Sequence, residues 1–390
     1  MKLNKLMLAM AVAASAFVAC NKQETTPVVN DNMGNKSIVL NIANVLPGTK
    51  APGTSIANQT QVTLNNYQIF FVDGNGTFYS PKDATASNAA VDTYFTVEPN
   101  KELTHQFHFL DNNVTRVIVV GNMGADFAPA NETALWTALS NVAVADQQDE
   151  NDLILYGSDS NLTADAPAHE NGEDQHPKPV YKAVVNLMPA VARFEVTGYE
   201  YAQKTVAEGQ TAPAREYASV VMNNQSLIGF YGTASMTSNG ETDWTVTPGA
   251  LAKPLVTYTW DNVYQQYFAK LTDADKAAWY YDATSYTLNA ANNYVAAATS
   301  GETNDCYAYN VFPAAVPSFI FQITATDANG IVTPMYLQTQ RFTGLTSIAA
   351  GNVYQMNIKF DDTVLKAAEK CIDVEITVHK WAVTVVTPEF

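Results

Sequence analysis

The densest group of side chains that could bind a metal ion or exchange protons lies near the middle of the chain. It contains five ligand-competent residues: His169, Glu170, Glu173, Asp174 and His176. Metal ligands need rigid elements and neighbouring hydrogen bonds that orient them. This stretch is polar and has no apolar frame, so we interpret it as a solvated linker and not as a metal site.

The remaining histidines and carboxylates are no better placed for catalysis. His105 and His108 are three residues apart in a strand pattern, so their side chains point to opposite faces and cannot bind one ion together. A second acidic group reads as a charged loop before a strand: Asp146, Asp149, Glu150 and Asp152. The sequence has no P-loop, glycine-rich dinucleotide turn, nucleophile elbow or zinc-binding cysteine pattern. We therefore expect no enzymatic activity, no cofactor and no metal site.

Cys20 is the residue whose position indicates a covalent modification. The chain begins with basic Lys2 and Lys5 and continues with an apolar stretch at 6–18, the pattern of an export signal. The stretch is too short to span a membrane. Residues 17–19 resemble the lipobox that precedes the lipid-bearing cysteine of bacterial lipoproteins. We expect a fatty acyl anchor such as palmitate on Cys20, which would hold the precursor in the outer membrane, and simple secretion is the alternative.

Composition excludes some classes of partner. The chain has 390 residues, is 47% hydrophobic and carries a formal net charge of −17. It can bury a large core, and its length favours two domains. Because an acidic surface repels phosphates, neither nucleic acid nor an anionic membrane is an expected partner. A disulfide between Cys306 and Cys371 is not required, and we expect buried thiols.

Hydrophobic residues alternate with polar ones over most of the chain, which is the period of a β-strand. Turn residues separate these runs, and the segments 73–76 and 327–330 are typical of hairpin turns. The pattern predicts an all-β sandwich protein. Strands are predicted at residues 37–46, 61–79, 102–110, 114–122, 152–158, 180–201, 318–342 and 352–360.

Helices are predicted as short decorations on the connections. One is expected at 131–142, where Asn131 can cap its first turn, and another at 272–281. The polar segment 161–181 contains three prolines and is the strongest candidate for a domain boundary. The predicted organisation is a signal peptide at 1–20, a tether at 21–36, an N-terminal domain at 37–175 and a C-terminal domain at 176–390.

Several stretches together resemble one known family. They follow in order a lipobox at Cys20, a first strand with Lys50 after it, RVIVVGNMGADF (116–127), LMPAVARFEVTGYEY (187–201), GNVYQMNIKF (351–360) and VEITVHKWAVTVV (374–386). Their order and spacing resemble those of the fimbrillins, the major subunits of type V pili in Bacteroidia. The resemblance extends over nearly the whole chain and rests on loose strand patterns in a common order.

The resemblance implies a fold and an assembly scheme. Fimbrillins have two transthyretin-like β-sandwich domains and reach the cell surface as lipidated precursors. A surface protease specific for Arg or Lys removes the first strand with its lipid. This leaves a groove in the sheet, which a strand of the next subunit fills. The implied partners are other copies of the chain, the anchor and tip subunits of the pilus, this protease, and a ligand on a host or bacterial surface.

Lys50 is the residue that matches the cleavage position of this scheme. It lies in a loop rich in Pro and Gly, and cleavage between Lys50 and Ala51 releases the strand at 37–46. The displaced strand carries Ile38, Leu40 and Ile42 at alternate positions. The family more often has Arg at this point, and the alternative is an ordinary exposed lysine.

Near the end of the chain, at His379 and Lys380, the alternation of apolar and polar residues shifts by one position; we call this a change of hydrophobic phase. Apolar residues occupy even positions in 372–378, whereas Trp381, Val383 and Val385 occupy odd ones. One strand cannot bury a single face through such a change without a break.

We therefore expect two strands at this end of the chain. Residues 372–378 lie in the C-terminal domain, and 381–390 form a donor strand that fills a neighbour's groove. In the alternative, the last segment is a core strand of its own domain. The predicted function is that of a shaft subunit of adhesive fimbriae. Two other functions stay open, a pilus anchor or tip subunit and a glycan-binding surface lipoprotein.

Overall fold

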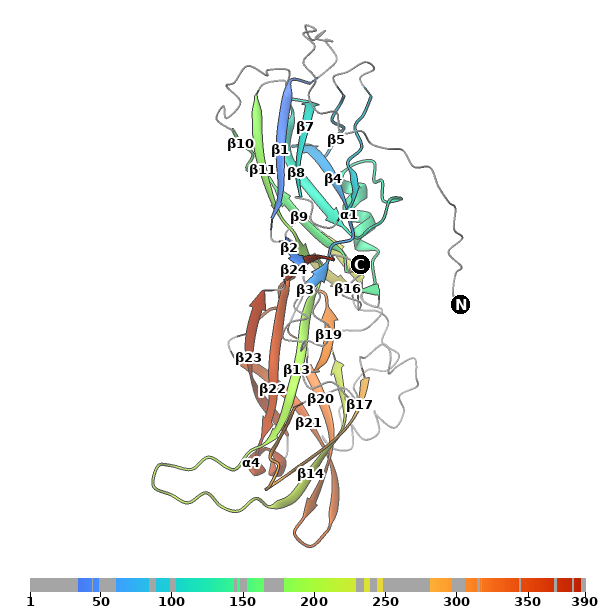
Figure 1. Ribbon diagram of the computed structural model, residues 1–390. Helices are drawn as coiled ribbons and strands as arrows, with labels where there is room; N and C mark the ends of the chain where they lie inside the picture. Colours follow the sequence, from blue (N-terminus) through green and yellow to red (C-terminus); the bar gives the residue numbers. More distant parts are fainter. Residues whose placement is uncertain are drawn as a thin grey trace.

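The computed structural model describes most of the chain and divides it into two β-rich lobes stacked end to end (Figure 1). Strands dominate both lobes, which confirms the predicted all-β class. The described residues are 34–43, 45–48, 61–83, 89–98, 103–143, 146–147, 153–164, 179–228, 235–238, 244–247, 281–296, 306–313, 316, 318–343, 345–367, 370–380 and 382–386.

The N-terminal lobe consists of two sheets. The first has the order β10-β11-β1-β7, and the second has the order β12-β9-β8-β4-β5, with β6 also paired to β4. A shared core lies between them and contains alternating aliphatic and aromatic side chains from both. The strands are β1 (Lys36–Ala43), β4 (Asn66–Asp73), β5 (Phe78–Tyr79), β6 (Tyr94–Thr96), β7 (Thr104–Leu110), β8 (Val114–Gly121), β9 (Leu155–Asp159), β10 (Thr163–Ala164), β11 (Val180–Asn186) and β12 (Met188–Pro189).

The C-terminal lobe is built on a nine-stranded set with the order β17-β14-β20-β21-β23-β22-β13-β18, in which β19 also pairs with β13. β23 links the two halves, because its first residues pair with β21 and its last with β22. The strands are β13 (Ala192–Tyr201), β14 (Tyr217–Ile228), β17 (Tyr281–Asn289), β18 (Tyr294–Ala296), β19 (Tyr307–Val311), β20 (Ser318–Asp327), β21 (Val332–Thr343), β22 (Asn352–Phe360) and β23 (Cys371–Lys380).

Two small sheets complete the described strands. β15 (Ser235–Ser238) pairs with β16 (Trp244–Thr247). Between the lobes, β24 (Ala382–Val386) lies in the middle of a three-stranded sheet, with β2 (Val45–Gly48) on one side and β3 (Gln61–Thr63) on the other. Figure 1 shows this sheet at the waist of the molecule.

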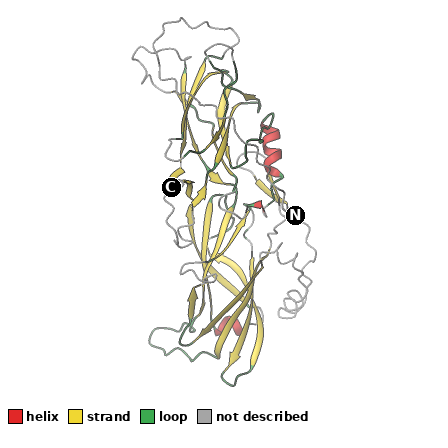
Figure 2. Ribbon diagram, turned by 45° about the vertical axis from the view of Figure 1, so that its right-hand side comes forward, coloured by secondary structure: helices red, strands yellow, loops and turns green. Residues whose placement is uncertain are grey.

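Two described helices decorate the strands. α1 (Glu132–Ser140) lies on the outside of the N-terminal lobe (Figure 2), and the Asn131 side chain caps it by accepting a 2.8 Å hydrogen bond from the Ala134 amide. This confirms the helix predicted at 131–142. The short α4 (Asp362–Lys366), capped by Asp361, was not predicted. The helix predicted at 272–281 lies outside the described residues, except for Tyr281, which begins β17.

The predicted hairpins are both present. β4 pairs antiparallel with β5, and β20 pairs antiparallel with β21. Gly76 and Gly330 close the turns with φ of 81° each, a backbone conformation that glycine adopts without a steric penalty. The cysteines also follow expectation in part: no disulfide joins Cys306 and Cys371, but Cys306 is buried while Cys371 is half-buried.

The change from one lobe to the other falls later than residues 175 and 176, where the sequence placed it. β11 pairs with β1 and β10, and β12 pairs with β9, so both strands extend the N-terminal sheets. Val191 belongs to the first core and Ala192 to the second. The polar segment connects two antiparallel neighbours, β10 and β11, of a single sheet, and hydrophobicity alone does not reveal that pairing.

Candidate functional site

β1 is an inner strand of its sheet. It pairs in parallel with β11, from Ser37 opposite Val180 to Ala43 opposite Asn186. On its other side it pairs antiparallel with β7, where Leu40 lies opposite His105. Without β1, the facing edges of β7 and β11 lose their hydrogen-bonding partner. β1, the first described strand in the sequence, therefore joins β7 to β11 within this sheet.

Alternate side chains of β1 lie in the core. Ile38 and Leu40 are 0% exposed and Ile42 is 4% exposed, whereas Asn41 on the opposite face is exposed. This is the predicted alternation of the strand, and it explains why these residues form a half-buried β-strand. Burial of three large aliphatic side chains contributes about 1.5 to 3 kcal/mol each. The strand predicted at 37–46 ends at Ala43, because Val45 and Leu46 pair in a different sheet as part of β2.

Polar groups hold the beginning of β1. The Lys36 side chain is 7% exposed, donates a hydrogen bond to the Val114 carbonyl and lies 4.4 Å from the centre of the Tyr181 ring. Burial lowers the pKa of Lys36. Next to it, Ser37 Oγ and His108 Nδ1 are 3.0 Å apart. These contacts fix one end of the strand in addition to its apolar face.

Aromatic residues lie beside the middle of β1. The Tyr67 hydroxyl and His105 Nε2 are 2.5 Å apart, and the His105 ring lies 4.2 Å from the ring of Phe95. Burial lowers the pKa of His105 and raises the pKa of Tyr67. His105 and His108 therefore each have a structural partner, and no described group of His, Cys, Asp and Glu is arranged to hold a metal ion.

The end of the chain separates into two strands in two different sheets. β23 ends at Lys380 in the sheet of the C-terminal lobe, where Lys380 lies opposite Asn352. β24 pairs with β2 and β3, with Val383 opposite Val45 and Val62 and Val385 opposite Pro47. The break falls next to the change of hydrophobic phase at His379 and Lys380. Trp381 lies outside the described residues, and for Val383 and Val385 the backbone alone is described.

Several predicted site residues cannot be placed. Cys20, Lys50 and Ala51 lie outside the described residues, as does the group from His169 to His176. The positions of their neighbours are nevertheless informative. β2 ends at Gly48 and β3 begins at Gln61, and both run parallel to β24 on its two sides. The chain between 48 and 61, which carries Lys50, thus connects strands that flank the C-terminal strand.

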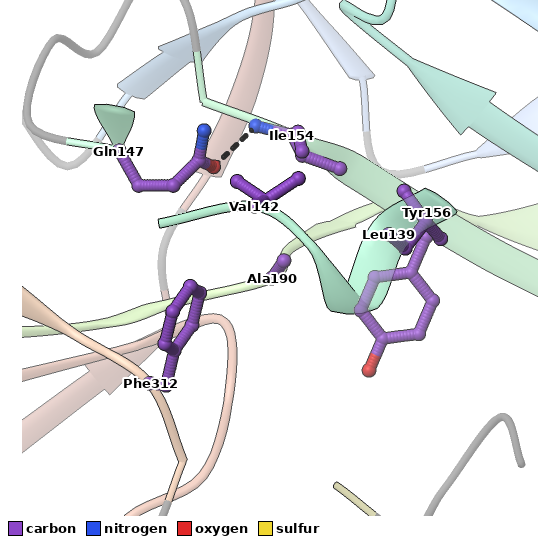
Figure 3. A pocket seen from close by; sticks show the side chains of 7 residues that line it. All are labelled: Leu139, Val142, Gln147, Ile154, Tyr156, Ala190 and Phe312. Carbon is purple, nitrogen blue, oxygen red and sulfur yellow. Dashed lines mark hydrogen bonds between the residues drawn. The ribbon is translucent and has the colours of Figure 1, made fainter. Parts of the chain in front are cut away.

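The joint between the lobes contains a small pocket that sequence reasoning missed (Figure 3). Gln147 Oε1 accepts a 2.8 Å hydrogen bond from the Ile154 amide, and the Gln147 carbonyl accepts one of 2.8 Å from Asn310 Nδ2. Phe312, from the C-terminal lobe, is 0% exposed within the N-terminal core. The pocket has no room for a water molecule, so it is a packing joint. Its lining consists of Leu139, Val142, Gln147, Ile154, Tyr156, Ala190 and Phe312.

Comparison with known proteins identifies the fold. No protein-family model and no curated protein sequence matches the chain. Among solved structures, a candidate cell adhesion protein from Parabacteroides distasonis is 10% identical over 92% of this chain and 99% of its own, with a TM-score of 0.50. The chain has the same fold as this cell adhesion protein.

Further structural neighbours come from the same group of bacteria. The fimbrilin of Porphyromonas gingivalis is 11% identical over 90% of this chain and 99% of its own, with a TM-score of 0.47. A candidate cell adhesion protein from Bacteroides eggerthii is 13% identical over 92% of this chain and 100% of its own, with a TM-score of 0.46. The neighbours are described as fimbrial proteins or as candidate cell adhesion proteins. No helix among the described residues is long and apolar enough to cross a membrane.

Proposed function

We propose that this chain is a subunit of cell-surface fimbriae that support adhesion. The fold that the chain shares with a candidate cell adhesion protein and the ordered sequence stretches that resemble those of fimbrillins support this function. In this proposal the chain is exported as a precursor, Cys20 receives the lipid, and the precursor is anchored in the outer membrane. Its partners are further copies of itself, together with the anchor and tip subunits of the fimbria.

Maturation begins with cleavage between Lys50 and Ala51 by an Arg- or Lys-specific surface protease. The observation that carries this step is the place of β1, which is an inner strand and yet lies at the very start of the described fold. Cleavage downstream of β1 frees a strand that is bound by main-chain pairing on both sides and by Ile38, Leu40 and Ile42. Its departure leaves an acceptor groove between β7 and β11.

The donor is the C-terminal segment 381–390 of the next subunit. β24 lies outside the nine-stranded sheet of its own lobe, so the core of that lobe does not depend on its pairing. Trp381, Val383 and Val385 repeat the alternate spacing of the three apolar residues of β1. Insertion restores the main-chain partners of β7 and β11, which is the way that strand addition binds peptides. The result is a polymer of many subunits.

N-terminal sequencing of protein sheared from the cell surface tests the maturation step. Mature subunits are expected to begin at Ala51, and an unboiled sample is expected to give a ladder of multimers on an electrophoresis gel. A Lys50→Ala chain is expected to remain an uncleaved, lipidated precursor without the ladder. Lys82→Ala is the matched control, because Lys82 follows β5 and its replacement leaves Lys50 intact.

Two results contradict the proposal. Mature protein that begins at Cys20, or a Lys50→Ala chain that still forms the ladder, refutes cleavage at this position. The lipid is tested separately with Cys20→Ala, which is expected to keep the precursor from surface display because no acyl chain is added. Normal display of that variant refutes the lipoprotein assignment.

A further inference from the structure

The C-terminal strand is held on both of its edges. On one edge, the pairs with β2 run from Val383 opposite Val45 to Val386 opposite Gly48. On the other, the pairs with β3 run from Ala382 opposite Gln61 to Thr384 opposite Thr63. A strand with two paired edges cannot join another sheet until one edge is released.

The two flanking strands lie on opposite sides of Lys50 in the sequence. β2 ends at Gly48 and follows β1 directly, with Asn44 between them, whereas β3 begins at Gln61. A cut between Lys50 and Ala51 therefore detaches β1 and β2 together and leaves β3 on the mature subunit.

We propose that β2 is a latch that keeps the C-terminal strand in its own subunit until the first strand is cut away. This inference rests on the proposed function and adds a mechanism that prevents the donor strand from leaving its subunit before cleavage. A single cleavage opens the acceptor groove by removing β1 and frees the donor strand by removing β2. The uncleaved chain can therefore neither accept a strand nor donate one. After cleavage, the freed strand binds a second copy of the mature chain.

The strand that remains after cleavage is a weak partner. β3 has three residues, and its pairing with β24 is the only strand pairing of that small sheet that remains after the loss of β2 among the described strands. An isolated two-stranded pairing is marginally stable in water. The groove of another subunit offers two edges and an apolar face instead, so the freed strand moves to the groove.

Pro47 shows which residues of β2 face β24. β2 has no partner on its outer side among the described strands, and proline is found in a sheet where its missing N–H points away from the neighbour. In a parallel ladder the residues that bond a given neighbour alternate. Leu46 therefore directs its N–H toward β24, whereas the N–H of Val45 points outward as that of Pro47 does.

Amide hydrogen exchange on the uncleaved full chain, kept intact by Lys50→Ala, tests the latch. In this background Leu46→Pro removes an N–H that faces β24, and Val45→Pro is the matched control on the same strand. The Leu46→Pro chain is expected to exchange the amides of 382–386 about tenfold faster than the parent, because local opening becomes easier. The Val45→Pro chain is expected to match the parent. Unchanged protection in β1 and β23 serves as the internal reference for an intact fold.

Mixing experiments extend the test to assembly. The uncleaved Leu46→Pro chain is expected to donate its strand to one mature subunit and stop there, since β1 still fills its own groove, whereas the uncleaved parent forms no such dimer. If Leu46→Pro disturbs β1 or β23, a chain with Gly-Ser-Gly-Ser at 45–48 replaces it in both measurements.

The latch is overturned if 382–386 exchange equally in all chains, if both proline variants release them alike, or if the parent precursor forms the dimer as readily as Leu46→Pro. Failure of mature subunits to form any multimer argues against the fimbrial function itself. The exchange measurement needs no assembly, so the two failures are distinguishable.

Discussion

At the scale of residues, buried and exposed side chains alternate along β1, so one face of the strand lies in the core and the other faces solvent. Leu40 is 0% exposed, whereas its neighbour Asn41 is exposed. In the proposed maturation, however, the whole strand leaves the subunit. A core substitution in β1 should therefore lower the stability of the precursor but leave the stability of the mature polymer unchanged. A substitution in a core strand that stays in the subunit would lower both.

Leu40→Ala tests that difference. In the uncleaved chain it is expected to lower the free energy of unfolding of the N-terminal lobe by about 2 to 5 kcal/mol, because a cavity replaces a buried side chain. Asn41→Ala is the matched control and is expected to change little. Denaturant unfolding measures both. Polymer made from the cleaved Leu40→Ala chain is expected to be as stable as the parent polymer, and a weakened polymer contradicts the loss of β1.

A second residue-scale feature is a hydrogen-bonded chain of polar groups in the C-terminal lobe, in which Asp282 is half-buried and its partners are buried. Asp282 accepts a hydrogen bond from the Tyr309 hydroxyl, which in turn accepts a 2.5 Å hydrogen bond from Gln225 Nε2. Gln225 Oε1 accepts a 2.5 Å hydrogen bond from the Tyr199 hydroxyl. Desolvation raises the pKa of Asp282 above its ordinary value of 3.8, although the bond from Tyr309 opposes the shift.

The raised pKa predicts the sign of a pH effect. Between pH 3.8 and the higher folded pKa, the folded state binds more protons than the unfolded state, so stability falls as pH rises through that window. Asp282→Asn removes this titration and keeps an oxygen acceptor. Its stability relative to the parent is expected to be greater at pH 7 than at pH 4, measured by denaturant unfolding at both. Glu375→Gln, at an exposed carboxylate of β23, is the control; an equal effect of Asp282→Asn at both pH values contradicts the argument.

At the scale of elements, the end of the chain consists of a permanent strand and a separate one. β23 contributes the buried Ile372 and Val374 to the C-terminal core, while β24 pairs at the waist. The position of this break could be predicted, because the hydrophobic phase changes at His379 and Lys380. The partners β2 and β3 could not, since no local pattern links strands at opposite ends of a sequence.

Deletion of 381–390 tests this division of roles. The C-terminal lobe is expected to keep its melting temperature, because β24 is outside its nine-stranded sheet, while the cleaved subunit no longer extends a polymer. Val383→Asp is expected to act in the same way, since burial of an unpaired charge is costly. Val374→Asp is the contrasting change and is expected to unfold the lobe. A melting temperature that collapses on deletion of 381–390 refutes donation.

Most strands could be predicted from alternation, and those that were missed have physical reasons. β14 carries Asn223, Asn224 and Gln225 in its middle, which breaks the apolar pattern. Inside the fold, Asn223 and Asn224 donate hydrogen bonds to Thr324 and Gln322 of the neighbouring strand β20. Gln225 bonds instead to Tyr199 of β13 and Tyr309 of β19, so none of the three side chains is left unsatisfied. Such compensation depends on residues far away in the sequence.

The edge strand β17 was missed for a different reason. Its segment, Tyr281–Asn289, pairs only with β14 among the described strands and exposes alternate residues, so its polar sequence reads as a loop. The place of β11 is a third case, since its parallel partner β1 is far away in the sequence. The local sequence therefore indicates which segments form strands in this chain, but it does not indicate which strands pair in a sheet.

At the scale of the whole molecule, two β lobes are joined by a waist where the chain's first strands meet its last (Figure 1). The lobes also share a packed joint, in which Phe312 of one lobe is buried in the core of the other. This arrangement places the proposed donor strand β24 between β2 and β3, the described strands before and after the proposed cleavage position at Lys50 in the sequence. In the proposed assembly, the donor strand of one subunit replaces β1 in the N-terminal core of the next, and the C-terminal core keeps all its strands.

Binding of a peptide that corresponds to residues 379–390 tests this exchange most directly. The acceptor is the chain that begins at Ala51 and ends at Lys380, which has an empty groove and no donor of its own. The exchange of β1 for a C-terminal strand predicts binding of one peptide per chain with slow release, and no binding to the uncleaved chain, whose groove holds β1. A peptide in which Asp replaces Val383 is the control and is expected not to bind. Equal binding to cleaved and uncleaved chains, or binding to neither, would contradict the exchange.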